Sequence, residues 1–323
     1  MMLLRGVFAL LFGLLLAAAA PAHADEAYPA RPLRIVVRYP PGAITDALCR
    51  IVATELGKVV GQTIIVENKP GGGTVIGTQA VKNSPADGYT VLLQLGALVS
   101  NVYSLKQPGY ALEDFTPISM LGQSAYVLII SSKYPFQTLQ ELIAYGKAHP
   151  GELNYSLTGG GGAQAVIGSK MKRATGIEWT DINYKGGAEA TQAVMSGNVH
   201  FSLPTQGAPL IHVNPDKLRL VAVTSEKRLE FLPEVPTFKE LGYPSIVDQT
   251  WFGLFVRSQV PSPVIDRLKS AMAEVMKSET MQAHLKTLRI SPYEGALEDV
   301  PAKMQRELAE FTEEAKKLGI EPQ

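Results

Sequence analysis

The chain has 323 residues, enough for two domains of ordinary size. Its 30 lysines and arginines balance its 30 aspartates and glutamates, which argues against a nucleic-acid-binding protein, because such proteins usually carry a basic excess. Hydrophobic residues make up 46% of the chain, so material for a globular core is present. The single cysteine, Cys49, excludes an internal disulfide and any metal site that needs two or more thiolates.

The N-terminus has the pattern of a secretory signal. Arg5 precedes an uncharged apolar run over residues 6–20, and Ala22-His23-Ala24 offers the small residues of a signal-peptidase site. A membrane anchor is the alternative, but a run of about 15 residues is shorter than the roughly 20 that span a bilayer. We therefore expect a signal peptide over residues 1–24, cleaved after Ala24, and an exported protein.

Strands and helices are expected to alternate through the rest of the chain. Short β-branched runs predict strands at residues 33–37, 64–67, 91–95, 127–131, 154–156, 218–224 and 252–256. Apolar residues at helical spacing predict helices at residues 47–59, 74–82, 188–195, 263–277 and 300–318, with further helices after the Thr138–Glu141 capping box and the glycine run 159–162. A second capping box, Thr237 with Glu240, predicts another helix start. This alternation indicates mostly parallel sheets covered by helices, and the length favours two lobes.

Two strand–turn–helix junctions carry the candidate chemistry. The first is YPPGAITD at residues 39–46, and the second is YSLTGGGG at residues 155–162. A helix start carries roughly half a positive charge and presents backbone N–H groups to anions, and glycine lets a ligand approach the backbone closely. Two such junctions facing each other would form an anion clamp without any arginine. The alternative is that the glycines only allow tight turns.

Sharper catalytic and cofactor motifs are absent from the sequence. Neither glycine cluster continues into Gly-Lys-Ser/Thr, so no phosphate loop and no cofactor are expected. Ser169 and Lys172 match Ser-x-x-Lys but lack the companion motifs of the enzymes that use it, so an exported hydrolase is a weak alternative. The histidines lack metal-ligand spacing, and no metal is expected. Trp251 is either a core residue or a pocket wall, with the core favoured.

Several segments together resemble the extracytoplasmic solute receptors of tripartite tricarboxylate transporters, the Bug family. They span nearly the whole chain after residue 24, in order and at family spacing. These segments are YPARPLRIVVRYPPGAITDALCRIVATELGKVVGQTIIVENKPGGGTVIG, SPADGYTVLL, EDFTPI, INYKGGAEATQAVMSGNV, LRLVAVTSEKRLEFLPEVPTFKELGYP and TWFGLFV. The resemblance implies an α/β, two-lobe periplasmic-binding-protein fold of type II-like architecture, with the ligand in a cleft between the lobes. Lobe one would combine residues 25–130 with 226–323, and lobe two would be residues 131–225.

The family's site falls on both glycine-rich turns. The resemblance implies that backbone groups there bind the carboxylate of a small organic acid. The candidate ligand-binding residues are Tyr39, Pro41, Gly42, Ala43, Thr45, Asp46, Leu157, Thr158, Gly159, Gly160, Gly161, Gly162, Ala165, Tyr184, Thr205 and Trp251. The chain departs from the family pattern at three polar positions, which are Leu157, Gly162 and Ala165 here. An apolar wall would follow, favouring a mono- or dicarboxylate with an aliphatic or aromatic body over citrate.

The resemblance also implies a working context. We expect a monomeric, non-enzymatic periplasmic receptor whose closed form is presented to membrane subunits of a tripartite transporter, and which could also feed a sensor kinase. No nucleic-acid partner is expected. A cytoplasmic regulator with the same lobes would need a DNA-binding module at the N-terminus, where the signal pattern stands instead.

Overall fold

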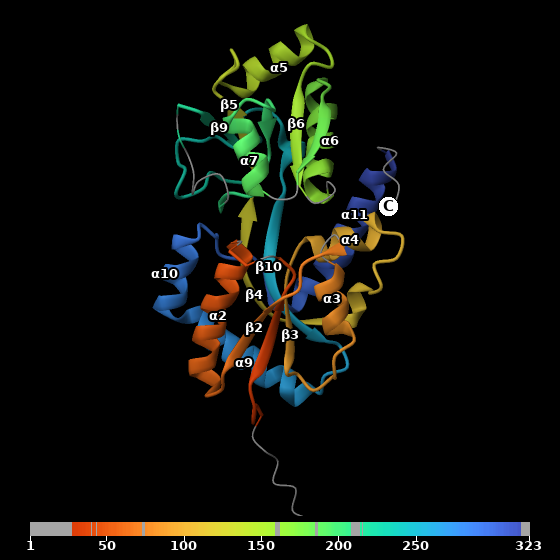
Figure 1. The fold of residues 1–323 in the computed structure, drawn as a ribbon, viewed down its shortest axis with the longest axis vertical. Helices are drawn as coiled ribbons and strands as arrows, with labels where there is room; N and C mark the ends of the chain where they lie inside the picture. Colours follow the sequence, from red (N-terminus) through yellow and green to blue (C-terminus); the bar gives the residue numbers. More distant parts are fainter. Residues whose placement is uncertain are drawn as a thin grey trace, which may run out of the picture.

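The computed structural model describes residues 28–39, 41–42, 44–72, 75–158, 162–184, 187–207, 214 and 216–317. The expected signal peptide lies outside these residues. The chain forms two lobes stacked along its long axis, each with a five-stranded sheet covered by helices (Figure 1). Within the described part of the chain, no helix is both long and apolar enough to cross a membrane.

Lobe one is built on a sheet of strand order β2-β1-β3-β10-β4. Its strands are β1 (Leu33–Val37), β2 (Ile64–Asn68), β3 (Thr90–Leu95), β4 (Phe115–Ala125) and β10 (Gln249–Arg257). Its helices are α2 (Ile44–Val60), α3 (Val75–Lys82), α4 (Ala97–Ser104), α9 (Ser262–Lys277), α10 (Glu279–Thr287) and α11 (Val300–Lys317). Strands β1, β2 and β3 pair in parallel, whereas β10 is antiparallel to both of its neighbours.

Lobe two repeats this plan with strand order β7-β6-β8-β5-β9. Its strands are β5 (Val127–Ser131), β6 (Asn154–Thr158), β7 (Thr180–Tyr184), β8 (Phe201–Ser202) and β9 (Leu218–Val223). Its helices are α5 (Leu139–Ala148), α6 (Gly162–Thr175) and α7 (Gly187–Met195). Here β5 is the reversed strand. The sheets are therefore mostly parallel, as the sequence predicts, and each has one strand of opposite direction.

The hydrophobic core follows from strands that are apolar on both faces. Along β1, Ile35 packs with the α2 and α9 side of the sheet, and its neighbour Val36 packs on the opposite face with α4 and α11. Along β5, Leu128 and Ile129 divide in the same way between the α6 side and the α7 side of the second sheet. Strands buried on both faces are typical of sheets covered by helices on both sides.

The chain crosses between the lobes twice, and one threonine joins the two crossings. Thr224 Oγ1 accepts from the backbone N–H of Tyr126 at 2.9 Å and donates to the backbone oxygen of Asp248 at 2.5 Å. Residues 229–246, which include Phe238 and Ile246, pack into the cores of the second sheet. From this packing we propose that the crossings lie at Tyr126 and Asp248. The lobe division at 130 and 226 stays a prediction, and we propose residues 127–247 as lobe two.

The two expected capping boxes differ in outcome. Thr138 and Glu141 exchange both hydrogen bonds and begin α5. Thr237 and Glu240 also exchange both bonds, at 3.0 and 2.8 Å, but only turns and a short 3₁₀ segment follow. The expected helix after Thr237 is therefore wrong, because the next residues turn back into the core through Phe238. Strands β4, β7 and β8 and helices α4 and α10 were not expected from the sequence.

Candidate functional site

The first glycine-rich turn lies between the carboxyl end of β1 and the start of α2. Gly42 has φ of 85°, a left-handed conformation that favours glycine, and the residue is exposed. Thr45 is only 3% exposed and lies in the first turn of α2, whose leading N–H groups have no acceptor inside the helix. Ala43 lies outside the described residues. The turn therefore has the backbone geometry that an anion site at a helix start requires.

The Asp46 side chain holds this turn in place through hydrogen bonds. Its Oδ2 accepts from the Gly42 N–H at 3.0 Å and from Arg50 Nε at 3.0 Å, and its Oδ1 accepts from Asn68 Nδ2 at 2.9 Å. Burial opposes ionisation of the carboxyl, but these hydrogen bonds outweigh it and hold the pKa of Asp46 below its ordinary value. Both carboxylate oxygens are thus engaged in the protein. Asp46 positions the turn, and the N–H of Gly42 is directed to Asp46.

A buried arginine next to the turn was missed by the sequence analysis. Arg38 is 1% exposed, donates to the Tyr39 hydroxyl at 2.8 Å and stacks over the Tyr39 ring at 4.9 Å. The Cβ of Arg38 lies 3.1 Å from the position of a Cβ on Gly77 in α3, and its charge acts on the Tyr110 hydroxyl, so this side chain lies on the α3 side of the sheet. The clamp without any arginine stays a prediction. A charged residue directly after the apolar run of β1 was the available signal.

The second turn is held by a glutamine that the sequence analysis did not assign a role. Gln164 Oε1 accepts from both the N–H and the hydroxyl of Thr158, at 2.9 and 2.7 Å, and its Nε2 donates to the backbone oxygen of Leu203 at 2.8 Å. These bonds tie the end of β6 to the start of α6, where Gly162 is the first helical residue. Gly159, Gly160 and Gly161 lie outside the described residues.

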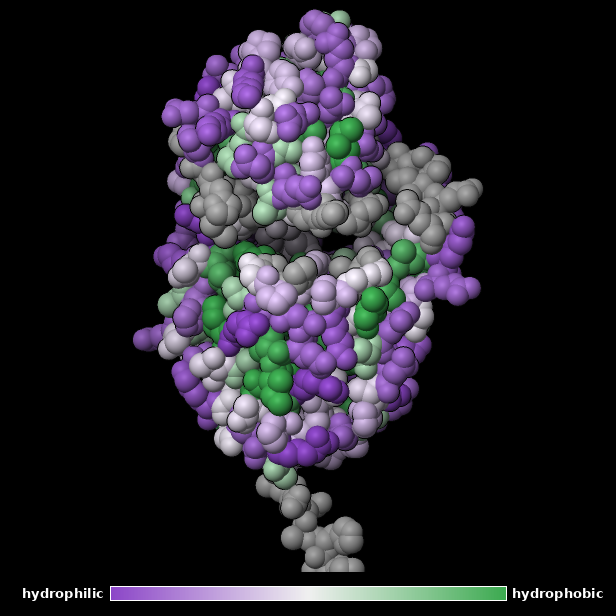
Figure 2. All heavy atoms as spheres, in the orientation of Figure 1, coloured by the Kyte–Doolittle hydropathy of each residue, from purple (hydrophilic) through white to green (hydrophobic). Residues whose placement is uncertain are grey.

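The starts of both helices lie where the lobes face each other. A Cβ on Gly207 of lobe two would lie 2.4 Å from the side chain of Ile44, the first residue of α2. A Cβ on Gly162, at the start of α6, would lie 3.7 Å from the hydroxyl of Ser100 on α4 of lobe one. The molecular surface is hollowed between the two lobes (Figure 2). Each of the two helix starts therefore lies at the boundary between the lobes.

Comparison with known proteins places this arrangement in a family. Residues 48–320 match the model of the tripartite tricarboxylate transporter family receptor. The chain belongs to this receptor family. The receptor is 35% identical over 266 residues to the protein BugT of Bordetella pertussis, covering 81% of each chain. It is 34% identical over 277 residues to a Cupriavidus necator protein encoded in the gbd 5′ region, covering 85% of this chain and 84% of that one.

Solved structures agree with the two-lobe fold of the receptor. The periplasmic binding protein BugD is 29% identical with a TM-score of 0.81, covering 92% of this chain and all of that one. The protein Rpa4515 of R. palustris, solved with adipate, is 28% identical with a TM-score of 0.84 and the same coverage. The α/β, two-lobe fold expected from the sequence is confirmed, and so is membership of the family.

Four further candidate residues of the receptor lie in the cores of lobe two or at the first crossing. Leu157 is 3% exposed and belongs to the core of lobe two, so its side chain does not form an open cleft wall, and half-buried Ala165 packs against the same core. Tyr184, at the end of β7, packs against the opposite core of lobe two. Thr205 forms an isolated antiparallel β-bridge with Tyr126 at the first crossing. The apolar wall expected from Leu157 is therefore largely a buried core surface.

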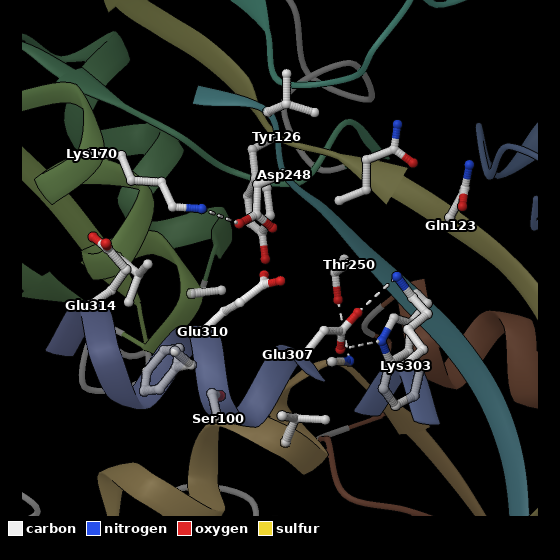
Figure 3. A pocket seen from close by; sticks show the side chains of 18 of the residues that line it. Ser100, Gln123, Tyr126, Lys170, Asp248, Thr250, Lys303, Glu307, Glu310 and Glu314 are labelled. Carbon is white, nitrogen blue, oxygen red and sulfur yellow. Dashed lines mark hydrogen bonds and ion pairs between the residues drawn. The ribbon is translucent and has the colours of Figure 1, made fainter. Parts of the chain in front are cut away.

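Trp251 is both a core residue and part of a cavity wall, the two alternatives expected from the sequence. It is 2% exposed within the core of lobe one, and it also lines a cavity beside α11, where its Nε1 donates to Glu307 Oε2 at 3.0 Å (Figure 3). It lies on the crossing segment rather than at either glycine-rich turn. Pro41 is exposed beside Gly42, at the rim of the first turn.

The Ser-x-x-Lys motif shows none of the features of a catalytic pair. Lys172 Nζ donates to the backbone oxygen of Trp179 at 3.1 Å, approaches Glu178 at 3.5 Å and lies 4.8 Å from the centre of the Trp179 ring. These contacts direct the amine toward β7 and away from a role as a base for Ser169. Burial also raises the pKa of the Cys49 thiol to about 12, which makes it a packing residue.

Proposed function

We propose that the receptor captures a small organic carboxylate between its lobes in the periplasm and delivers it to the membrane subunits of a tripartite transporter. The observation that supports the proposal is that two helix starts, one from each lobe, both lie at the boundary between the lobes. A carboxylate that replaces its water with backbone N–H groups from both lobes stabilises the closed form, because only closure completes the site. The candidate binding residues at the two turns remain proposals.

The ligand we propose is a mono- or dicarboxylate with an aliphatic or aromatic body. Support comes from Rpa4515, a relative solved with adipate, which is an aliphatic dicarboxylate. Gly162, the first residue of α6, carries no side chain at this helix start, and Arg38 is the buried cation next to the first turn. A tricarboxylate such as citrate would need more cationic partners than these.

Export is the other part of the proposal. The N-terminal pattern at residues 1–24 would direct the chain out of the cytoplasm, with cleavage after Ala24. Mass spectrometry of the exported protein checks this part, since an intact N-terminus would contradict it.

A thermal-shift screen tests ligand capture. Adipate, longer aliphatic diacids and aromatic acids should raise the melting temperature of the protein, because a ligand at about a thousand times its Kd adds about 4 kcal/mol of stability. The matching diamides should have no effect. Tight binding of citrate, without binding of the other acids, would contradict the ligand class, and a response to no carboxylate would contradict the proposed function.

A pair of glycine variants tests the location of the site. Gly42 and Gly61 both have positive φ, 85° and 69°, and neither has any atom near the position of an added Cβ. Alanine should therefore strain both turns to a similar extent, by about 1–2 kcal/mol. Only Gly42→Ala should also weaken carboxylate binding, by tenfold or more, because the strain displaces the turn that leads into the α2 start. Equal affinities of the two variants would place the site elsewhere.

A further inference from the structure

A cavity lies between the two lobes, against α11 (Figure 3). It has a volume of about 380 Å³ and is lined by α4, α6, α11 and the crossing segment 247–251, so both lobes contribute to it. This volume is within the range of small-molecule sites. We call it the α11 pocket.

The α11 pocket carries an excess of negative charge. Six carboxylates and two lysines line it: Glu226, Asp248, Glu294, Glu307, Glu310, Glu314, Lys170 and Lys303. Four of the carboxylates have cationic partners, in the pairs Asp248–Lys170, Glu307–Lys303, Glu226–Lys239 and Glu314–Arg173. Glu294 and Glu310 form no ion pair with any other described residue. Both side chains are exposed, so these two charges lie at the rim of the pocket, where a bound cation can approach them.

The walls favour an organic cation over a metal ion. Trp251, Tyr126, Tyr293 and Phe311 contribute aromatic rings to the lining, and such rings attract ammonium groups through their faces. Among the described residues, no group of three or more histidine, cysteine, aspartate or glutamate side chains is placed to hold a metal ion. Carboxylates beside aromatic rings are the combination that recognises a substituted ammonium.

A buried hydroxyl in the same lining has no hydrogen-bond partner among the residues that the structure describes. Ser100, on α4, is 5% exposed, and its Oγ forms no hydrogen bond. The atom faces lobe two, 3.7 Å from the position of a Cβ on Gly162. A buried hydroxyl without a partner costs free energy, and an occupant with an N–H donor would satisfy it. This observation is independent of the charge count.

We propose that the α11 pocket binds an organic ammonium group. The group could belong to a separate small amine or to the cationic end of a ligand whose carboxylate lies at the glycine-rich turns. Glu310 and Glu294 supply the opposite charge, the aromatic rings enclose the alkyl part, and Ser100 accepts an N–H where one is present. Since α6 comes from lobe two and α11 from lobe one, the occupant holds the lobes together.

Tryptophan fluorescence reports on this pocket directly. The chain has two tryptophans, so a Trp179→Phe background leaves Trp251, in the pocket wall, as the only one. Choline and putrescine are the amine probes, and 3,3-dimethylbutan-1-ol is the uncharged analogue of choline. The amines should change the fluorescence with saturation and the alcohol should not. A second comparison uses 6-aminohexanoate against hexanoate, which tests whether the ammonium belongs to the carboxylate ligand.

Two glutamine variants on α11 give the matched control. Glu310→Gln removes a carboxylate of the pocket that has no ion pair, and Glu313→Gln removes the same charge from an exposed position outside the lining. Glu310→Gln should weaken amine binding about fivefold, the upper range for a partly exposed charge pair, and Glu313→Gln should leave it unchanged.

The outcomes separate the two sources and can overturn the proposal. Binding of choline or putrescine that survives Gly42→Ala indicates a separate amine. Binding of 6-aminohexanoate that is lost in Gly42→Ala indicates one ligand spanning both sites. Amine binding without any carboxylate binding would refute the proposed function and leave this pocket standing. No ammonium-dependent signal, equal effects of the two glutamine variants, or saturable Ca²⁺ binding that Glu310→Gln weakens would each overturn the ammonium pocket.

Discussion

The hydrogen bonds that Asp46 accepts at the first turn can be tested quantitatively with the substitution Asp46→Ala. The substitution removes acceptors from three donors, on Gly42, Arg50 and Asn68. The Arg50 side chain is 55% exposed, so it returns to water at little cost, and most of the loss comes from the other two bonds. Hydrogen bonds to a charged group contribute about 1.5–3 kcal/mol each before the freed donors regain water. We expect a net loss of about 2–3 kcal/mol.

Urea unfolding and calorimetric titration measure the two consequences of this change. Stability should fall by the amount above, and carboxylate affinity should fall at least tenfold, because the turn loses its fixed geometry. Asp266→Ala is the control, since Asp266 is an exposed aspartate near the start of α9. If Asp46→Ala and Asp266→Ala have the same unfolding midpoint and the same affinity, the bracing role is refuted.

The lowered pKa of Asp46 gives this contribution a definite pH dependence. Its pKa in the folded protein lies below the unfolded value of about 3.9, so the carboxylate stabilises the fold above that value and the contribution is lost as pH falls through the folded pKa. The difference in unfolding free energy between wild type and Asp46→Ala should therefore be constant near neutral pH and shrink below about pH 4. A difference that grows on acidification would contradict the assignment.

Three further substitutions have expected outcomes. Gln164→Ala removes the three hydrogen bonds that hold the second turn. In urea unfolding it should lower stability by about 2 kcal/mol, and in calorimetric titration it should weaken carboxylate binding. Unchanged affinity would show that Gln164 does not support the binding site. Gly122→Ala would place a Cβ 2.4 Å from the Ile290 side chain, which should destabilise the protein by about 1–3 kcal/mol and lower its melting temperature. An unchanged melting temperature would contradict that contact. Trp251→Phe removes the hydrogen bond to Glu307 and should cost about 1–2 kcal/mol in urea unfolding, whereas wild-type stability would show that this bond is unimportant.

The parts of the fold that the sequence predicted are those with strong local patterns. Strands β1 and β5 are found at the expected residues because short β-branched runs are unambiguous between turns. Strand β4 was missed because Pro117 and Gly122 interrupt its pattern, and its order comes from pairing with β10, more than a hundred residues later in the chain. Packing across the sheet, which a local window cannot contain, decides such elements.

The candidate site shows the same limit. The two turns were predicted because glycine, proline and N-capping residues mark helix starts locally. Their supports were missed because each depends on a distant residue: Asn68 reaches Asp46 across 22 positions, and Gln164 reaches Leu203 across 39. Leu157 was placed at a cleft wall because alignment to a pattern gives a position without the direction of its side chain.

The place of β10 in the first sheet fixes the order in which the two lobes can be completed. The second sheet is built from strands β5 to β9, which follow one another between residues 127 and 223, whereas the sheet of lobe one holds β10 between β3 and β4. Until residues 249–257 have been synthesised, β3 and β4 have no partner between them, although both were made early. The lobe that begins first is therefore finished last, and a chain truncated before β10 would keep a whole second sheet beside a first sheet divided in two.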